Sequence, residues 1–408
     1  MIIKRLLLAV LFLTFLSSCD KDSGIIESLP DDEELPTDEP VKNEDGTLHI
    51  EKPFFINSDN VKNKTSDPKF LNQMIKLTES SPKGSSIFLS VYGFDYEPLM
   101  NALIEADKRG VEVHALIDSS TVNQRESNQL AYSKLGNLKK PSEMIGVNNN
   151  LQNGASAINH EKYMIFSKVE MEHGIAENVV FCSSHNFSYG GSRKIQDGLL
   201  ITNNNLYNSF KNNWHRVAAL AHDRLGMKNY KYTVDDVGDG LTVRFFPRRI
   251  NGFWDGGDDI VNVLNELDEG SYSRTTVRVM MAFWEKDRND IILKLTEIAK
   301  RGGTVEVIAR NTYREEVNAE LKKLYDSGGY VKLLDLSKHN VHSKCMIIKG
   351  SIGGVEQEII LSGSHNYTDG GLKYANEFIL ESRNKSYFDD YMQYFDELKF
   401  KLINSAPW

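Results

Sequence analysis

Two short stretches of the chain pair a histidine with a lysine at the same spacing. His160 and Lys162 lie within NHEKYMIF, and His342 and Lys344 lie within VHSKCMII, so each triplet leads into an apolar run. A neutral imidazole can attack phosphorus, an imidazolium can donate a proton, and a lysine offers a compact positive charge to an oxyanion. A single triplet of this kind also fits a solvated strand end. Its repetition predicts phosphoryl chemistry with one histidine from each half.

A second polar pattern follows each triplet. Residues 182–197 read CSSHNFSYGGSRKIQD, and residues 362–377 read SGSHNYTDGGLKYANE. Both segments carry Ser-His-Asn, an aromatic residue, a hydroxyl residue and Gly-Gly, and both end on an amide followed by an acid. A duplicated fold needs repeated core positions, but it does not need the same polar residues twice. The repeated polar set therefore predicts one site built from both halves.

The candidate catalytic residues are the two triplets, the two asparagines and the two acids: His160, Lys162, His342, Lys344, Asn186, Asn366, Asp197 and Glu377. The hydroxyls of Ser184 and Ser364 are candidates for substrate binding through neutral hydrogen bonds. The two acids are candidates for holding the second ring nitrogen of each histidine. The sequence leaves open whether each acid serves its own half or the opposite one.

Neither half of the chain shows a recognised zinc spacing such as H-E-x-x-H, although His185 and His365 add two further histidines. The lysines already provide the charge that a metal ion would supply to a phosphate. No metal and no other cofactor is therefore expected.

The intervening sequence predicts the elements that position these groups. In both halves a β-branched apolar run is followed by an amphipathic helix that ends at Lys-Arg-Gly and by another apolar run. These segments are residues 85–95, 97–110 and 111–118, and then residues 275–285, 289–303 and 304–310. Strands joined by crossover helices predict a parallel or mixed sheet covered by helices.

The pattern of H-x-K, a strand, Gly/Ser-Ser-x-Asn and a downstream acid resembles the phospholipase D superfamily, in which two such motifs form one phosphodiesterase site. The resemblance covers roughly residues 54–400. It implies an α/β fold of two tandem phospholipase D-like repeats, with mixed or parallel sheets flanked by helices and the active site at the pseudo-twofold interface. The family usually has an aspartate five residues after each lysine, whereas this chain has Ser167 and Lys349 there. The first copy also has Ser183 where the second has Gly363.

The resemblance implies a covalent phosphohistidine intermediate. It favours His160 as the nucleophile and His342 as the general acid, which then activates water or another alcohol. The near-symmetry of the two motifs leaves the reverse assignment open.

The N-terminus predicts export. Lys4 and Arg5 precede the apolar segment Leu6–Leu16, which is too short to span a bilayer as a helix, so residues 1–18 are expected to be a signal peptide. Leu16-Ser17-Ser18-Cys19 resembles the bacterial lipoprotein cleavage box, which implies a lipid on Cys19. The protein is expected to be anchored by lipid to a bacterial membrane, on either the periplasmic or the exposed side.

Residues 19–50 are expected to form a disordered acidic tether. Residues 20–45 contain eleven acids against two lysines, and this segment accounts for a net charge of −9. The rest divides into a first half at 51–230 and a second half at 231–408. It is close to neutral, which disfavours a broad electrostatic grip on nucleic acid. A monomer is expected.

The leading functional hypothesis is a phospholipase D-like phosphodiesterase that hydrolyses phospholipids or transfers the phosphatidyl group. The alternatives are a metal-independent nuclease of the same superfamily and a binding protein that keeps the fold without turnover. The sequence does not define the headgroup or the acceptor alcohol.

Three further patterns give structural expectations. Cys182 and Cys345 are flanked by apolar residues and are expected to be buried free thiols on strands. The glycine pairs at 190–191 and 370–371 are expected to form tight turns with positive φ angles, and the alternative is a pair of phosphate-facing turns. The segment FFPRRINGFW, with Arg248 and Arg249, is expected to be a solvated loop.

Overall fold

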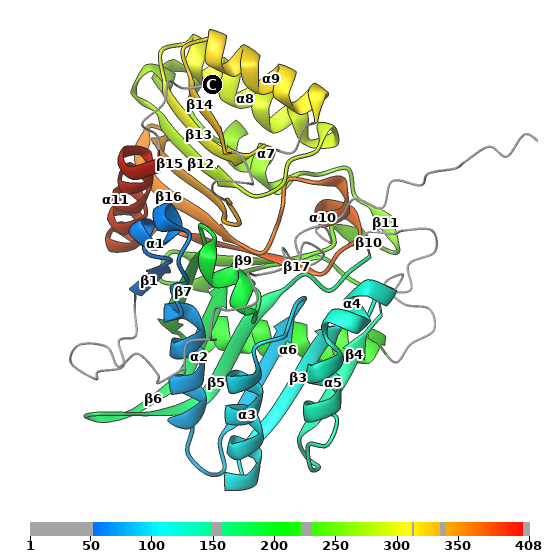
Figure 1. Cartoon of the computed structure of the whole chain (residues 1–408). Helices are drawn as coiled ribbons and strands as arrows, with labels where there is room; N and C mark the ends of the chain where they lie inside the picture. Colours follow the sequence, from blue (N-terminus) through cyan, green and yellow to red (C-terminus); the bar gives the residue numbers. More distant parts are fainter. Residues whose placement is uncertain (1–51, 149–156, 222–229, 312–313, 335–339, 403–408) are drawn as a thin grey trace, which may run out of the picture.

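The structure is a computed structural model that describes residues 52–148, 157–221, 230–311, 314–334 and 340–402. The expected signal peptide (1–18), the expected tether (19–50) and Cys19 lie outside the described residues. Within the described part of the chain, no helix has the length and apolarity needed to cross a membrane. Figure 1 shows two sheets, one above the other, each packed against helices.

The first sheet has seven strands from the first half of the chain. Its three strands at one end run parallel, and the others join in antiparallel fashion. The order is β1 (Lys52–Phe55), β7 (Asp197–Thr202), β6 (Gly174–Ser183), β5 (Lys162–Met171), β2 (Ser86–Val91), β3 (Glu112–Asp118) and β4 (Glu143–Val147).

The second sheet has eight strands and repeats this arrangement. The order is β14 (Tyr330–Leu334), β13 (Thr304–Arg310), β12 (Thr276–Met281), β15 (Lys344–Ile352), β16 (Val355–Gly363), β17 (Glu377–Ser382), β9 (Leu241–Phe246) and β8 (Thr233–Gly238). Strands β12, β13 and β14 are parallel, and the other pairings are antiparallel. The two sheets therefore match strand for strand from β4 and β14 to β7 and β17, which confirms the two-repeat α/β fold.

Helices cover both sheets. In the first half they are α1 (Ser58–Asn63), α2 (Lys69–Glu79), α3 (Glu97–Arg109), α4 (Val122–Ser127), α5 (Gln129–Leu135) and α6 (Asn204–Ala221). In the second half they are α7 (Asp259–Asn265), α8 (Asn289–Lys300), α9 (Glu315–Asp326), α10 (Asp369–Lys373) and α11 (Lys385–Leu402). The predicted inner face of the helix at 97–110 is confirmed, because Leu99, Leu103 and Ala106 of α3 are fully buried.

One hydrophobic core spans both halves, and the second half has a further core of its own. Phe210 of α6 packs edge-on against Phe378 of β17 and Phe245 of β9, with ring centroids 5.3 and 5.1 Å apart. Helix α11 of the second half packs on α1 and β1 of the first. Cys182 on β6 and Cys345 on β15 are buried free thiols, as expected. Because apolar contacts continue across the interface, the halves hold a fixed orientation on which a shared site can depend.

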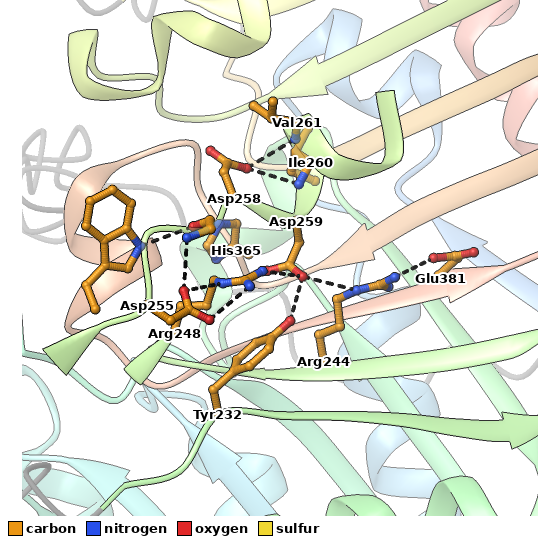
Figure 2. A network of polar contacts seen from close by, with 12 residues as sticks. Tyr232, Arg244, Arg248, Asp255, Asp258, Asp259, Ile260, Val261, His365 and Glu381 are labelled. Carbon is orange, nitrogen blue, oxygen red and sulfur yellow. Dashed lines mark hydrogen bonds and ion pairs between the residues drawn. The ribbon is translucent and has the colours of Figure 1, made fainter. Parts of the chain in front are cut away.

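The expectation of a solvated loop at Arg248 and Arg249 is wrong. The side chain of Arg248 is only 13 % exposed and binds Asp255 through two nitrogens, at 2.8 and 2.9 Å, and Asp259 at 2.9 Å. Figure 2 shows this network, in which Tyr232 and Arg244 also reach Asp259. Arg248 thus links the segment after β9 to the start of α7 through Asp259, and Arg249 donates to the distant carbonyl of Lys373.

Candidate active site

The two His-x-Lys triplets meet at the interface between the halves. The backbone N–H of His160 donates to the carbonyl of Asn376 at 2.9 Å, and that of His342 donates to the carbonyl of Ile195 at 2.9 Å. His160 is thus hydrogen-bonded to the residue just before β17 of the second half. His342 is hydrogen-bonded to the residue two positions before β7 of the first half. Lys162 and Lys344 are the first residues of β5 and β15, so each triplet stands where a buried strand begins. The fold brings the two predicted half-motifs into one site.

Glu377 of the second half holds His160 of the first. Its carboxylate oxygens lie 2.9 and 3.0 Å from His160 Nδ1, and the two side chains are only 2 % and 1 % exposed. Burial, with Lys162 and Lys344 nearby, holds the pKa of His160 well below its usual range. Burial also raises the pKa of Glu377 well above its usual range, so one proton lies between the two groups, and the neutral ring donates Nδ1–H when Glu377 is ionised. Among the described residues its Nε2 has no hydrogen-bond partner, so that lone pair is available for attack.

His342 is held by different groups. Its Nδ1 lies 3.1 Å from the carbonyl oxygen of Ser184 and 3.0 Å from Oε1 of Gln196. Two carbonyl-type oxygens facing Nδ1 favour the tautomer that donates from this nitrogen. Burial, followed by the charge of Lys344 3.2 Å from the same nitrogen, lowers the pKa of His342 well below its usual range. The second histidine therefore has a neutral amide where the first has a carboxylate.

The geometry corrects the expectation for Asp197. Ser184 N–H donates to the carbonyl of Asp197, whereas Ser364 N–H donates to that of Phe378, so Asp197 is the structural counterpart of Phe378. The counterpart of Glu377 is Gln196. Equal spacing in the sequence was misleading because the turns differ: residues 189–193 form a 3₁₀ turn, and residues 369–373 form a turn of α-helix.

Asp197 instead supports the packing between the halves. One carboxylate oxygen accepts hydrogen bonds from the hydroxyls of Ser362, at 2.5 Å, and Tyr391, at 3.0 Å. Asp197 is fully buried, and these two partners come from β16 and α11 of the second half. Its role here is to satisfy buried polar groups, and it does not contact a catalytic histidine.

The two lysines give the site its positive charge. Lys162 Nζ and Lys344 Nζ each donate to the carbonyl of their own histidine at 2.6 Å, and both side chains are almost completely buried. Lys162 also lies over the ring of Tyr92, with Nζ 5.5 Å from the centroid. Both lysines lower the pKa of both histidines, so both act electrostatically on the same small volume. Two ammonium groups, with the one carboxylate placed at Nδ1 of His160, suit a bound phosphodiester anion.

The motif serines lie behind the histidines. The Ser184 hydroxyl donates to Gln196 Oε1 at 2.9 Å, and the Ser364 hydroxyl accepts from Phe378 N–H at 3.0 Å and hydrogen-bonds Glu377. Both hydroxyls thus hold the groups that orient the histidines, which differs from the expected role in substrate binding.

The motif asparagines follow the serines by two residues. Asn186 is partly buried and accepts a hydrogen bond from Gly93 N–H at 3.3 Å, while Asn366 is 2 % exposed. Their place at the ends of β6 and β16 is the same in the two halves.

The neighbouring histidines have structural roles. His185 stacks on Phe70, and His365 stacks on Phe246 and contacts the buried Arg288, 3.0 Å from its Nε2. The expectation of positive φ angles at the two glycine pairs is wrong, since none of the four is among the residues with positive φ. Close approach explains Gly191 instead, because a Cβ there would lie 2.7 Å from the His185 ring.

Sequence reasoning missed two functional candidates. Gln196 was hidden by its neighbour Asp197, and only the pairing of strands across the halves reveals it. Glu161, between His160 and Lys162, is fully buried and accepts from Asn213 of α6 at 2.6 Å. Glu161 directly precedes Lys162, the first residue of β5, and neighbouring residues of an extended chain point to opposite sides. This was the available signal that its side chain faces away from the lysine.

Glu161 is expected to make the stability of the protein depend on pH. Burial raises its pKa from 4.5 to about 7. Between these values the folded protein keeps a proton that the unfolded chain has released, so the free energy of unfolding falls as the pH rises, by roughly 3 kcal/mol in total. Glu161→Gln should remove this dependence. Denaturant unfolding of parent and variant at pH 5 and pH 8 measures this dependence. If the free energies of unfolding of parent and variant differ by the same amount at both pH values, the prediction is contradicted.

Comparison with known proteins identifies the class. The family described as "cardiolipin synthase, PLD-like domain" matches residues 73–217 and 267–399. These two segments cover most of the chain and contain both half-motifs. The chain belongs to the phospholipase D superfamily.

Individual relatives are more distant. The phospholipase D of Rickettsia prowazekii is 29 % identical over 147 residues, which cover 36 % of this chain and 60 % of that protein. The phospholipase D of Rickettsia typhi is 28 % identical with the same coverage. The chain thus spans about three fifths of the length of these curated relatives. The crystal structure of phosphatidylserine synthase from Haemophilus influenzae matches at a TM-score of 0.57 and 12 % identity, covering 88 % of this chain and 87 % of that one, which supports the fold alone.

Proposed function

We propose that the protein is a phospholipase D-like phosphodiesterase that hydrolyses phospholipids, or transfers their phosphatidyl group, through a phosphohistidine intermediate. The observation that carries this proposal is the pair of histidines, each held through Nδ1 by a residue of the opposite half, with two buried lysines beside them. A binding protein without turnover would not require this set, because affinity for a phosphate needs cations but not two oriented imidazoles.

In the first step, His160 Nε2 attacks phosphorus. The N–P bond forms as the bond to the alcohol oxygen breaks, and the imidazole gains positive charge. The Glu377 carboxylate, 2.9 Å from Nδ1, compensates this charge. The contrast between Glu377 and Gln196 therefore supports His160 as the nucleophile.

His342 protonates the leaving alkoxide. The site lowers its pKa, so an imidazolium there is a strong acid. It becomes protonated when the negatively charged phosphodiester binds, because an opposite charge nearby favours the charged form. The amide of Gln196 orients the ring without holding its proton as a carboxylate would.

In the second step, neutral His342 takes a proton from water or an alcohol, whose oxygen attacks phosphorus. The P–N bond breaks and His160 returns to its neutral form. Lys162 and Lys344 stabilise the nonbridging oxygens throughout.

A lipid substrate is supported by the relatives named phospholipase D and by the near-neutral charge beyond residue 45. The test is to incubate the purified protein, in the presence of a chelator, with mixed phospholipid vesicles and separately with DNA and RNA. Release of a headgroup or formation of a phosphatidyl alcohol is expected, and it should disappear in His342→Ala. Cleavage of nucleic acid that is lost in this variant, with lipids unchanged, would show a nuclease instead.

We also propose that lipidation of Cys19 anchors the protein to a bacterial membrane. The motivation is Leu16-Ser17-Ser18-Cys19 after the short apolar segment, since two or more acyl chains give a stable anchor. Cys19→Ser is expected to move the protein from the membrane fraction to the soluble fraction after a high-salt wash. Retention of the variant at the parental level would reject the anchor.

A further inference from the structure

A small hairpin at the start of the second half exposes large apolar side chains. Strands β10 (Arg249–Ile250) and β11 (Phe253–Trp254) pair so that Ile250 lies opposite Phe253. Ile250 is 50 % exposed, Phe253 77 % and Trp254 43 %. Ile250 and Phe253 are cross-strand partners on one face of the hairpin, and Trp254 lies on the other face, so the hairpin exposes apolar side chains on both faces. Single exposed apolar residues are common on protein surfaces, but three on one short hairpin need an explanation.

The hairpin is held rigidly in this exposed position. Its two-residue turn, Asn251-Gly252, has φ angles of 52° and 83°, which is the conformation that an Asn-Gly hairpin favours. Arg249 donates to the carbonyls of Gly252 at 2.7 Å and Lys373 at 2.6 Å. The indole N–H of Trp254 donates to the Gly257 carbonyl at 3.1 Å. The aromatic side chains are therefore presented by a fixed scaffold.

The hairpin lies close to the catalytic carboxylate. The backbone N–H of Arg248 donates to the carbonyl of Leu372 in α10 at 2.8 Å. A Cβ on the next-door Gly371 would lie 3.5 Å from Glu377 Oε1. One short helix thus separates the hairpin from the group that holds His160. Figure 1 shows β10 and β11 beside α10, at the level where the two halves meet.

We propose that this hairpin inserts into the surface of a phospholipid bilayer and brings the catalytic site to its substrate. The proposal rests on the proposed lipid substrate. Aromatic side chains with a nearby lysine suit the region between acyl chains and headgroups, and Lys373 Nζ lies 4.0 Å from the centre of the Trp254 ring. A hairpin so near the catalytic residues cannot be covered by a large protein partner without restricting access to them.

The contact should be mainly apolar. Arg248 is paired with Asp255 and Asp259, and Lys373 lies 2.5 Å from Asp369. Arg249 donates to backbone carbonyls, so it is the main positive charge at the base of the hairpin without a carboxylate partner among the described residues. Binding through this patch is therefore expected to resist salt, unlike binding through a basic surface.

Tryptophan fluorescence tests the insertion directly. Of the four tryptophans, Trp214 and Trp284 are 1 % and 2 % exposed. Trp408 lies outside the described residues and is replaced by phenylalanine in the full-length chain used for the test. On vesicles of phosphatidylcholine brominated along the acyl chains, Trp254 emission should be quenched, and the quenched component should disappear in Trp254→Phe. Quenching requires contact with the acyl chains, so a lipid on Cys19 does not by itself produce it.

A kinetic test uses Phe253→Asp, with Phe400→Asp as the matched control. Phe400 is 82 % exposed on α11, which lies on the other side of the molecule in Figure 1. Phe253→Asp should lower kcat/KM on vesicles by about tenfold or more, because it replaces the most exposed apolar group of the patch with a charge. It should leave activity on a monomeric short-chain phospholipid unchanged, and Phe400→Asp should leave both activities unchanged.

The outcomes separate the two proposals. Absence of Trp254 quenching from an enzyme active on vesicles, or equal loss on both substrates in Phe253→Asp, overturns the docking proposal. A dimer that Phe253→Asp dissociates, without effect on vesicle binding, assigns the patch to a second copy and also overturns it. If brominated acyl chains quench Trp254 but the protein cleaves no phospholipid, the result supports docking and rejects the proposed function.

Discussion

Replacing either His160 or His342 with alanine is expected to reduce turnover by about 10⁴-fold or more, since each performs a different part of the same reaction. In the proposed mechanism, His160 forms the bond to phosphorus, and His342 moves the proton to and from the oxygen. Because one missing group already stops the cycle, the double variant should be scarcely slower than either single variant. Steady-state assays of the three variants measure these losses of turnover, on whichever substrate the parent cleaves in the test with phospholipid vesicles, DNA and RNA.

The control for these variants is folding. His160 and His342 are only 1 % and 3 % exposed, so alanine leaves a cavity at the interface, and the unfolding midpoint of each variant must be compared with that of the parent. His185→Ala is a useful contrast because that ring stacks on Phe70 and supports the fold. It should lower stability while the folded fraction stays active. About half of the parental activity in each catalytic variant would instead indicate two independent sites.

Glu377→Gln is expected to slow formation of the phosphoenzyme by about 10²- to 10⁴-fold, as is typical when a carboxylate behind a catalytic histidine becomes an amide. The amide oxygen still reaches His160 Nδ1, but it cannot compensate the positive charge that develops on the ring. Rapid quenching during the first turnover, with detection of protein-bound phosphate, measures this step separately from hydrolysis.

The matched variant is Gln196→Glu, which places a carboxylate 3.0 Å from the other histidine. A carboxylate favours imidazolium and raises the pKa of His342, so its acid form persists to higher pH. The first step should then extend to more alkaline pH, and the second step, which needs neutral His342, should require higher pH. Equal losses in the first step from Glu377→Gln and Gln196→Glu would contradict the assigned roles. Accumulation of phosphoenzyme in Glu377→Gln would indicate the reverse assignment, with His342 as the nucleophile and His160 as the general acid.

The sequence by itself determined the duplicated architecture. Apolar periodicity in residues 85–118 and 275–310 identified the strand, helix and strand that recur as β2, α3, β3 and β12, α8, β13. These segments are predictable because burial of one face and the local backbone preference favour the same element. The repeated histidine–lysine triplets also identified the two segments that meet, since an active site restricts polar residue types and their order.

Only the tertiary structure decided which residue supports each histidine. The spacing from Asn186 to Asp197 equals that from Asn366 to Glu377, and this suggested two equivalent acids. The intervening turns are wound differently, so the hydrogen-bond register shifts by one residue and places Gln196 against His342. Since consecutive strand residues face opposite sides, that shift turns Asp197 toward Ser362 and Tyr391. Counting along the chain does not reveal the register, because register depends on backbone pairing within each half, between β6 and β7 and between β16 and β17, and on the contacts between the halves.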